Sequence, residues 1–324
     1  MMEDTLVIEK KKKSGNVMTD IANPRKRLVI GDIHGHIEPF KTIYESEDPD
    51  DVIILGDYFD NFNGTDAEII DCFKEILKMQ KAHKKGEFIM LIGNHDFQYI
   101  YLTETYSGKR KSYEISVSMM LDKCIEKHQM QYVYVDRINK TVYSHAGITN
   151  NWISENRIFT DDLNDLNDLD PRKYAFTYRG GDSGYGDGPY ASPIWVRPST
   201  LENDMYIDMC RSKWTQIVGH THYDKAKIVF DDGTFIKGCH VWNNIDPYNQ
   251  INAPILYVMD SLPNYYMVEE IATDGEIMKR EVKSTKMNFD KALNDKIQIQ
   301  KDIRRDQNIA KLAEMCGIKF ATPI

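Results

Sequence analysis

Cysteine is sparse in this chain, and its distribution excludes two kinds of structure. The five cysteines among 324 residues are an odd number, and none belongs to a Cys-x-x-Cys pair. A disulfide framework and a thiolate zinc site are therefore both disfavoured. Long apolar runs are also missing, since no stretch approaches the roughly 18 to 20 residues of a membrane span and no apolar signal-peptide core stands at the start. The sequence predicts a cytoplasmic protein that does not enter a membrane.

Positive charge is in the minority. The chain has 41 lysines and arginines against 50 aspartates and glutamates, a formal net charge of −9. This balance argues against a protein whose whole surface binds nucleic acid. Between residues 279 and 312, however, ten basic residues face five acidic ones. That stretch is expected to be a solvated helix, with docking to an acidic partner or to nucleic acid as the alternative.

Composition divides the chain into three segments. Residues 1–24 include a lysine run and are expected to be a disordered leader. Residues 25–262 contain all the chemical motifs and are predicted to form one domain. Residues 263–324 form a C-terminal extension, in which Phe289, Leu293 and Ile297 recur every four residues. This spacing predicts an amphipathic basic helix that packs on the domain or mediates dimerisation.

Five short blocks of aspartate, asparagine and histidine each follow or close an apolar run. They are Gly31-Asp32-Ile33-His34-Gly35, Gly56-Asp57-Tyr58-Phe59-Asp60, Gly93-Asn94-His95-Asp96, Ser144-His145-Ala146-Gly147 and Gly219-His220-Thr221-His222. The first three runs are typical of strands covered on both faces, and ligand sites gather at the carboxyl ends of such strands. Carboxylate and neutral imidazole ligands suit Mn, Fe, Zn or Co rather than Ca or Mg alone. Two such ions can clamp a phosphoryl group.

The remaining pattern predicts an α/β fold. Thr65-x-x-Glu68 is a capping box that opens a helix, and a second helix is expected from Ser112 to His128. The later half is richer in strands, and Asp232-Gly233 is typical of a hairpin turn. The acidic repeat 162–170 is expected to be an exposed turn or a short helix, because it lacks the glycine and closing glutamate of a calcium loop. The glycine-rich segment 179–188 predicts either a lid over the site or a plain connector.

The five blocks resemble the signature of the calcineurin-like metallophosphoesterases, most closely the phosphoprotein (serine/threonine) phosphatase branch of bacterial and viral type. The resemblance covers roughly residues 27–245 and implies an α/β sandwich with mixed sheets flanked by helices. It implies that residues 25–262 are the catalytic domain and that two divalent metal ions are bound, with Mn favoured over Fe, Zn, Ni and Co. The ligands it implies are Asp32, His34, Asp57 as the bridge, Asn94, His145 and His220. His222 is a further candidate, because the second histidine of Gly-His-x-His is a ligand elsewhere in the superfamily.

The resemblance also implies roles beside the metals. His95 is the expected general acid, and Asp60 would orient its imidazole and raise its pKa. The chain departs from the phosphatase pattern at Asn61, where the family usually has an arginine that holds the phosphate. Asparagine offers neither the charge nor the fork of a guanidinium. Arg197 is the expected replacement, and Arg179 is the second choice.

The implied reaction is hydrolysis of a phosphate monoester by direct attack of a hydroxide held between the two ions. The closest substrate class is phosphorylated serine or threonine in proteins. Dinucleoside polyphosphate hydrolysis and nucleic-acid or cyclic-nucleotide hydrolysis remain alternatives, because the blocks do not specify the leaving group. An inactive metal-binding scaffold is the alternative of another class, disfavoured because none of the six core ligand positions is lost. The expected partner is therefore a phosphorylated protein or a nucleotide; nucleic acid is not indicated, and the sequence predicts no oligomeric state.

Overall fold

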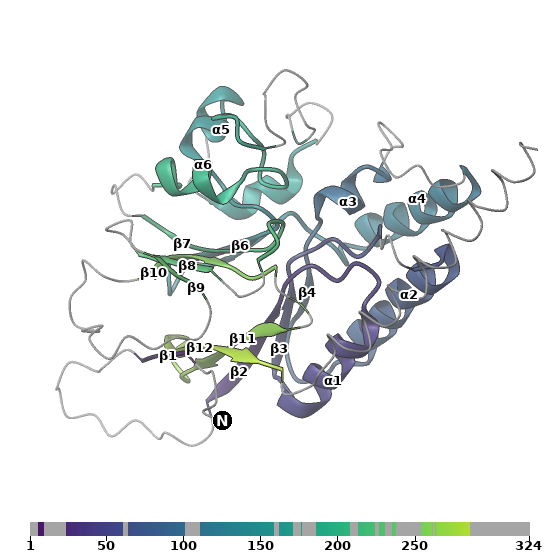
Figure 1. The fold of residues 1–324 in the computed structure, drawn as a ribbon, viewed down its shortest axis with the longest axis horizontal. Helices are drawn as coiled ribbons and strands as arrows, with labels where there is room; N and C mark the ends of the chain where they lie inside the picture. The colour runs from purple at the N-terminus through teal and green to yellow at the C-terminus, as the bar shows by residue number, and fades with distance from the viewer. Residues whose placement is uncertain are drawn as a thin grey trace, which may run out of the picture.

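Two six-stranded sheets form the centre of the molecule (Figure 1). The structure is a computed structural model, and it describes residues 6–9, 24–60, 64–100, 111–158, 162–170, 176, 186–207, 213–223, 227–230, 235–237, 254–260, 262 and 264–285. The first sheet has the strand order β1-β12-β11-β2-β3-β4, and the second has the order β5-β6-β7-β10-β8-β9. Helices flank both sheets. This mixed α/β sandwich confirms the predicted fold class.

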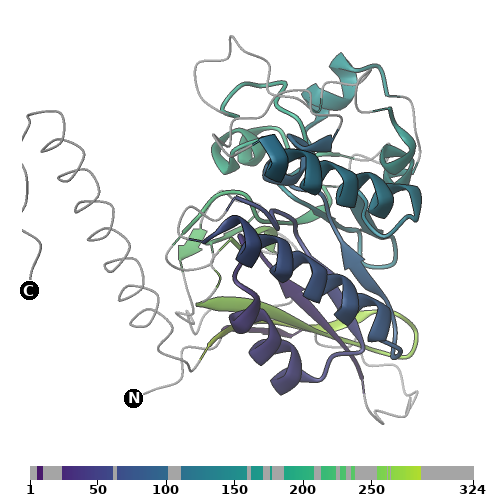
Figure 2. The same cartoon turned by 90° about the vertical axis from the view of Figure 1, so that its right-hand side faces the viewer.

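The first sheet combines a parallel half with an antiparallel half. Its parallel strands are β2 (Arg25–Ile30), β3 (Asp51–Ile54) and β4 (Phe88–Met90). Two helices connect them, α1 (Ile37–Glu47) and α2 (Asp66–Ala82), and two more follow β4, α3 (Asn94–Phe97) and α4 (Lys111–Glu126). The antiparallel strands are β1 (Leu6–Glu9), β11 (Tyr265–Ile271) and β12 (Ile277–Ser284). Figure 2 faces the side covered by α1, α2 and α4.

The second sheet has three parallel strands at its centre. These are β6 (Thr141–Ser144), β7 (Thr215–Val218) and β10 (Pro254–Val258). Antiparallel strands flank them, namely β5 (Val133–Asp136), β8 (Lys227–Phe230) and β9 (Phe235–Lys237). Between β6 and β7 the chain forms α5 (Asn150–Glu155), the 3-10 helix η2 (Leu163–Asp168) and α6 (Pro198–Asn203).

Alternating side chains of the strands build separate apolar layers. In β2, Leu28 and Ile30 join the cluster that contains Phe40 of α1 and Phe73 of α2. Val29, which points to the opposite face, joins the cluster between the two sheets. The period of two that characterises strands therefore places helices on one face and the second sheet on the other. Both faces are apolar, which explains the continuous hydrophobic runs in the sequence.

A charged network joins the sheets inside this apolar interface. Arg27 of β2 donates to Asp136 of β5 at 3.1 Å and to Glu269 of β11 at 3.2 Å. The hydroxyl of Tyr143 in β6 also donates to Glu269. All four residues are buried. Because a buried charge is tolerated only when it is paired, this network ties the two sheets in one register.

The local predictions hold at most elements. The capping box is confirmed, since Thr65 Oγ1 accepts from the backbone of Glu68 and the Glu68 carboxylate accepts from the backbone of Thr65. The predicted helix 112–128 corresponds to α4. Strands β8 and β9 pair antiparallel as the hairpin signal required, although Asp232-Gly233 lies outside the described residues. The acidic repeat forms η2.

The repeat 162–170 is not simply exposed, however. Leu163 and Leu166 of η2 are buried in the main core cluster, because the 3-10 geometry brings every third side chain to one side. The carboxylates remain on the outside of this short element. The expectation of an exposed turn was therefore wrong for its leucines.

The first sheet extends beyond the two predicted boundaries. Strand β11 pairs with β2 and strand β12 pairs with β11, so residues 264–285 complete the sheet that carries the first motif blocks. Strand β1, within the predicted leader, pairs with β12. The boundaries at residues 24 and 262 therefore do not coincide with the edges of the sheet. Most of the leader and the predicted amphipathic helix around Phe289 lie outside the described residues.

Among the helices that the structure describes, none has the length and hydropathy that crossing a membrane requires.

Candidate metal centre

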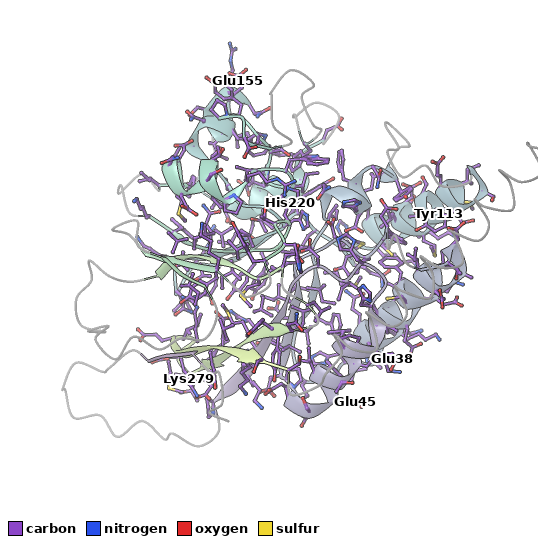
Figure 3. All side chains as sticks on the ribbon, in the orientation of Figure 1. Glu38, Glu45, Tyr113, Glu155, His220 and Lys279 are labelled. Atoms are coloured by element: carbon purple, nitrogen blue, oxygen red, sulfur yellow. The ribbon has the colours of Figure 1, made fainter. Side chains whose placement is uncertain are left out.

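The five motif blocks converge where strands of both sheets end. Asp32 follows β2, Asp57 follows β3, and Asn94 begins α3 just after β4. His145 and His220 follow β6 and β7 of the other sheet. His220, labelled in Figure 3, lies near the centre of the molecule, where the strand ends meet. The carboxyl ends of parallel strands thus gather the side chains, as the sequence pattern predicted.

The aspartate Asp57 belongs to two groups of potential metal ligands. One group is Asp32, His34 and Asp57, and the other is Asp57, His145 and His220, with the ligand atoms of each group within 4.8 Å of one another. Asp57 Oδ2 lies 3.6 Å from His34 Nε2 and 3.4 Å from His145 Nε2. A carboxylate with an imidazole on either side is suited to bridging two cations.

Backbone carbonyls set the tautomer of each imidazole in these groups. His34 Nδ1 lies 2.8 Å from the carbonyl oxygen of Phe59, and His145 Nδ1 lies 2.9 Å from that of Leu55. His220 instead places Nε2 3.1 Å from the carbonyl oxygen of Trp195. A carbonyl can only accept, so each of these nitrogens carries a hydrogen, and the other nitrogen is the one left to bind a metal ion. This is the usual arrangement of metal-binding histidines.

The remaining ring nitrogens of His145 and His220 both face a further acceptor, the side-chain oxygen of Asn94. Asn94 Oδ1 lies 2.9 Å from His145 Nε2 and 2.9 Å from His220 Nδ1. With the tautomers above, an oxygen acceptor and two nitrogen acceptors face one point, an arrangement that a cation would satisfy. Asp32, Asp57 and His34 offer the same kind of metal-binding oxygen and nitrogen atoms in the other ligand group. The residues therefore fit two divalent ions.

The pKa values of the buried groups also indicate that the site favours a positive charge. Burial, reinforced by the charge of Asp260, raises the pKa of Asp32 well above its ordinary value. Burial also acts to raise the pKa of Asp57, but the imidazoles of His145 and His95 hold it well below the ordinary value. For His145 burial acts downward, yet Asp57 and Asp32 outweigh it and raise the pKa to about 9. Carboxylates this close together in a buried site require cationic neighbours.

The backbone at the site is unusual. Of the eight described non-glycine residues with positive φ, four belong to the motif blocks: His34, Asp57, Asp60 and His220. Left-handed backbone costs energy for residues that have a Cβ. Such conformations cluster at functional sites, where the surroundings hold them in place.

Asp96, the last residue of its block, supports the conformation of Asp57. Its carboxylate accepts backbone hydrogen bonds from Asp57 at 2.9 Å, Tyr58 at 2.8 Å and Gly93 at 2.8 Å. Asp96 is fully buried, and burial together with the charge of Asp57 raises its pKa to about 7. Its role is therefore to bind the loops after β3 and β4 together.

His95 lies beside Asp60, the residue expected to orient it. His95 Nδ1 lies 2.9 Å from Asp60 Oδ2, and the His95 backbone donates to Asp57 Oδ1 at 2.9 Å. Burial acts to lower the pKa of His95, but Asp57 and Asp60 outweigh it and raise the pKa to about 9. Gln98 and Tyr99 also donate to Asp60. Sequence reasoning missed these two residues, although their places one turn after the third block were the available signal.

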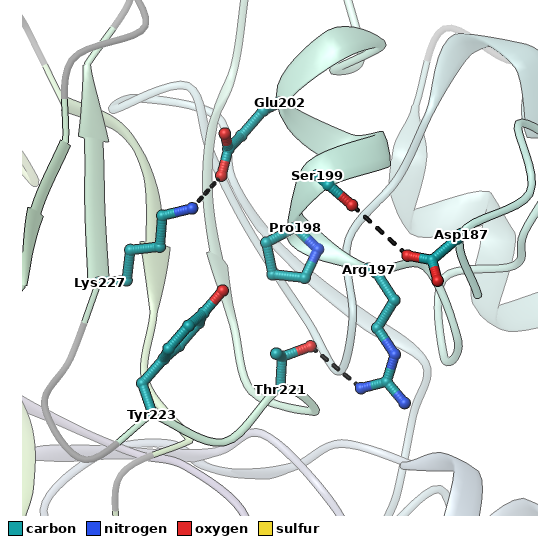
Figure 4. Close-up of a pocket in the computed structure, with 8 residues that line it drawn as sticks. All are labelled: Asp187, Arg197, Pro198, Ser199, Glu202, Thr221, Tyr223 and Lys227. Carbon is teal, nitrogen blue, oxygen red and sulfur yellow. Dashed lines mark hydrogen bonds and ion pairs between the residues drawn. The ribbon is translucent and has the colours of Figure 1, made fainter. Parts of the chain in front are cut away.

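Arg197 lies close to the metal-ligand groups. Its Nη1 atom donates to the carbonyl oxygen of His220 at 3.4 Å and to Thr221 Oγ1 at 3.2 Å. A pocket of about 380 Å³ lies beside it, lined also by Tyr223, Lys227 and Asp187 (Figure 4). The structure thus places the predicted replacement arginine next to the second group. Arg179 and Asn61 lie outside the described residues.

His222 is not among the residues of the two ligand groups. Its side chain is 61% exposed, and its Nδ1 atom lies 3.7 Å from Oδ1 of Asp260. Asp260, by contrast, is only 8% exposed. The sequence offered no motif that would single out Asp260, which follows β10. The structure therefore brings together six of the seven predicted ligands, and it places the unpredicted carboxylate of Asp260 beside the seventh.

A four-layer α/β sandwich that presents shared carboxylate and imidazole donors at its strand ends is the architecture of a metal-dependent phosphoester hydrolase. The chain belongs to the calcineurin-like phosphoesterases: residues 25–224, more than half of its length, match the model of that family. No curated protein matches the chain. The family match confirms the predicted superfamily and enzyme class, and the family typically binds two divalent metals. It does not single out a branch, a substrate or a particular metal.

Proposed function

We propose that this enzyme is a phosphomonoesterase that uses two manganese ions and acts on phosphorylated serine or threonine residues of proteins. The first support is the likeness of the five blocks to the phosphoprotein phosphatase branch. The second is access: His34 and His95 keep 29% and 30% of their side chains exposed, while Asp57 and His145 are buried. The proposed catalytic groups thus lie at the surface, within reach of a phosphate on another protein.

The observation that carries this proposal is the pairing of His95 with Asp60 beside Asp57. The alcohol of serine or threonine is a poor leaving group unless its oxygen receives a proton. The Asp60 carboxylate, 2.9 Å from His95 Nδ1, favours the protonated imidazole, which can supply that proton. Cleavage of a polyphosphate releases an already stable phosphate anion, which has little need of such an acid. The pair therefore favours a phosphate ester of an alcohol over a dinucleoside polyphosphate.

Each residue then has a defined task. Asp32, His34 and Asp57 would hold the first ion, and Asp57, Asn94, His145 and His220 would hold the second. When bound, the two ions would lower the pKa of water and neutralise charge on the phosphate. Arg197 would bind the phosphate oxygens, in place of the arginine that the chain lacks at position 61. His95 would protonate the leaving oxygen through Nε2, while Asp60 holds the hydrogen on Nδ1.

Manganese is proposed because the donors are oxygen and imidazole nitrogen without any thiolate. The two described cysteines, Cys72 and Cys124, are buried free thiols, which supports the proposed cytoplasmic, reducing environment.

The test is a turnover panel on protein reconstituted with Mn²⁺. It compares a phosphoserine peptide, a dinucleoside polyphosphate, a cyclic nucleotide and an aryl phosphate, with Asp57→Asn as the inactive control. Peptide turnover well above the nucleotide rates, abolished in the control, is expected. A preference for a nucleotide would move the enzyme to that substrate class. Two bound ions with no turnover of any substrate would indicate a scaffold.

The task of Arg197 has its own test. Arg197→Lys keeps the charge but loses the planar fork, so the KM for the phosphopeptide should rise and kcat/KM should fall about tenfold or more. Metal content should stay unchanged. Unaltered kinetics of Arg197→Ala would remove Arg197 from the phosphate site.

A further inference from the structure

Asp260 lies just beyond strand β10, which none of the motif blocks follows. Strand β10 runs parallel to β7, so the two strands end at the same edge of the second sheet. Beyond β7 the chain continues into Gly219 and His220, and beyond β10 it continues into Met259 and Asp260. The Met259 backbone donates to the carbonyl of Val218 at 2.7 Å, and the Tyr223 backbone donates to the carbonyl of Asp260 at 3.2 Å. Asp260 is thereby fastened to the loop that carries the fifth block.

Asp260 also touches the first block from the other sheet. A Cβ on Gly31 would lie 2.2 Å from the carbonyl oxygen of Met259 and 3.1 Å from the Cα of Asp260. Only glycine permits so close an approach of two backbones. The end of β10 is therefore pressed against the turn that presents Asp32. Asp260 lies where the ends of β2 and β10 meet, on the side of the first ligand group.

The Asp260 side chain faces an imidazole and lies close to the turn that carries Asp32. The backbone of Asp260 lies against the turn that presents Asp32, so its carboxylate adds negative charge beside that ligand. Its Oδ1 atom lies 3.7 Å from His222 Nδ1, and Asp260 is only 8% exposed. Two buried carboxylates side by side are costly unless a cation lies near both. Around the second ligand group, the described residues place Asn94 and two imidazoles beside Asp57, and the neighbouring Asp96 carboxylate is already held by three backbone N–H groups.

We propose that Asp260 is a positioning residue of the first metal subsite, where it orients His222 and adds negative charge beside Asp32, so that this subsite binds its ion more tightly than the second. The inference rests on the two-metal site of the proposed function. Metal-binding histidines commonly pair their second nitrogen with a carboxylate, and removing that carboxylate weakens metal binding about 10- to 100-fold. The unequal charge of the two subsites makes their affinities unequal.

The experiment titrates the metal-free full-length protein with Mn²⁺ and follows free Mn²⁺ by electron paramagnetic resonance. The wild type should show a tight and a weak class of one ion each. Asp260→Asn should weaken the tight class about 10- to 100-fold and leave the weak class nearly unchanged. Asn94→Ala removes a ligand of the second subsite only, so adding Asp260→Asn to it should still weaken the remaining ion. Asp274→Asn, the same change in the exposed β11–β12 turn, is the matched control and should alter neither class.

A second readout separates this role from a merely structural one. Without metal, Asp260→Asn should keep or raise the thermal midpoint, because it removes a repulsion from Asp32. With Mn²⁺ present, the midpoint should rise less than that of the wild type. A lower midpoint without metal would make Asp260 a structural residue and overturn the proposal, as would equal weakening of both classes. His222→Ala should weaken the same class, and combining it with Asp260→Asn should cost less than the sum of the two effects.

Failure of this proposal can be told apart from failure of the two-metal site. Asp57→Asn should weaken both classes, since Asp57 is shared. If it does so while Asp260→Asn changes nothing, only the role of Asp260 is lost. If no variant of the motif blocks affects Mn²⁺ binding, the two-metal site itself is refuted.

Discussion

His95 is the single residue on which the proposed chemistry depends most directly. Replacing it with asparagine removes the proton donor while keeping a side chain that can hydrogen-bond Asp60. The kcat on a phosphoserine peptide should fall about 10²- to 10⁴-fold, the usual range for loss of a general acid. An aryl phosphate, whose leaving group needs no proton, should be affected much less. Steady-state kinetics on both substrates checks this, with bound metal measured beside them. Equal losses on both substrates, or loss of metal, would contradict the assigned role.

Gly93 limits the space around the shared carboxylate. A Cβ at this position would lie 2.0 Å from Asp57 Oδ1 and 2.6 Å from the Asp57 backbone nitrogen. Gly93→Ala should therefore displace Asp57 and reduce the bound metal from two ions toward none, as measured by elemental analysis after dialysis.

A matched control exists for this clash. Gly86→Ala would place a Cβ 2.3 Å from Asp51 Oδ1 in the turn before β4, away from the ligand groups. It should lower stability but leave the metal stoichiometry at two. Equal metal loss in both variants would show that Gly93 acts through the fold rather than through Asp57.

Most of the site residues could be named from the sequence because each block follows a strand directly. Asp32, Asp57 and Asn94 needed only the strand signal and the rule that parallel strands end at one edge. Asp260 could not be found this way, because it follows β10 without any glycine-containing block. Its place depends on β10 pairing with β7 and touching Gly31, contacts that no local pattern records. Gln98 was missed because its one signal, a place one turn after the third block, does not tell which side chains face Asp60.

Among the elements, the end of α1 offers a prediction on pH dependence. Glu47, in the last turn of this helix, accepts from the hydroxyl of Tyr266 in β11 at 2.8 Å and from Lys283 in β12 at 3.0 Å. Burial acts to raise the pKa of Glu47, but these hydrogen bonds and the charges of Lys283 and Lys26 outweigh it and lower the pKa. The stabilisation is therefore present above the unfolded pKa of about 4.5 and is lost as the pH falls through the lower folded value.

Glu47→Gln should lower the free energy of unfolding by about 2 kcal/mol at pH 7, as for other hydrogen bonds to charged groups. The difference from the wild type should shrink as the pH falls below about 4.5. Urea unfolding at several pH values measures it. Glu75→Gln, in the exposed pair with Lys78, is the control and should leave stability nearly unchanged. A pH-independent loss at Glu47 would mean that packing rather than charge is responsible.

Elements with strong local signals were predicted correctly, and the misses have a common cause. In the sequence, strand β2 is indicated by an apolar run, and helix α2 is indicated by a capping box. Strands β11 and β12 carry no motif. Strand β11 pairs with β2, about 240 positions earlier in the chain, and β12 pairs with β11. An isolated apolar segment can pair with any of several distant strands. The pairing depends on how the whole sheet is assembled, which local sequence does not record. The boundary placed at residue 262 reflects this limit of local reasoning.

For the whole molecule, the metal centre and the Arg27 network join the same two sheets at different places. Asp57 comes from the first sheet and His145 from the second, so ions held between them would fasten the two sheets together. Mn²⁺ at 100 times its dissociation constant should stabilise the protein by about 2.7 kcal/mol per site. Thermal unfolding with Mn²⁺ and with a chelator measures this effect. Asp57→Asn should abolish most of the metal-dependent shift, and a shift that persists in full would place the ions elsewhere.

Four residues of the centre have left-handed backbone conformations. At these positions, the residue that the metal site needs is not the one that would make the metal-free protein most stable to heat. Glycine adopts positive φ at little cost, so replacing any of them with glycine relaxes the backbone while deleting a proposed ligand or the partner of His95. A library of variants screened for stability in the presence of a chelator should therefore become enriched in glycine at these positions, and every winner should be a poorer enzyme. Screening in manganese would reverse that enrichment. The metal supplied during laboratory evolution thus decides which residues survive at His34, Asp57, Asp60 and His220.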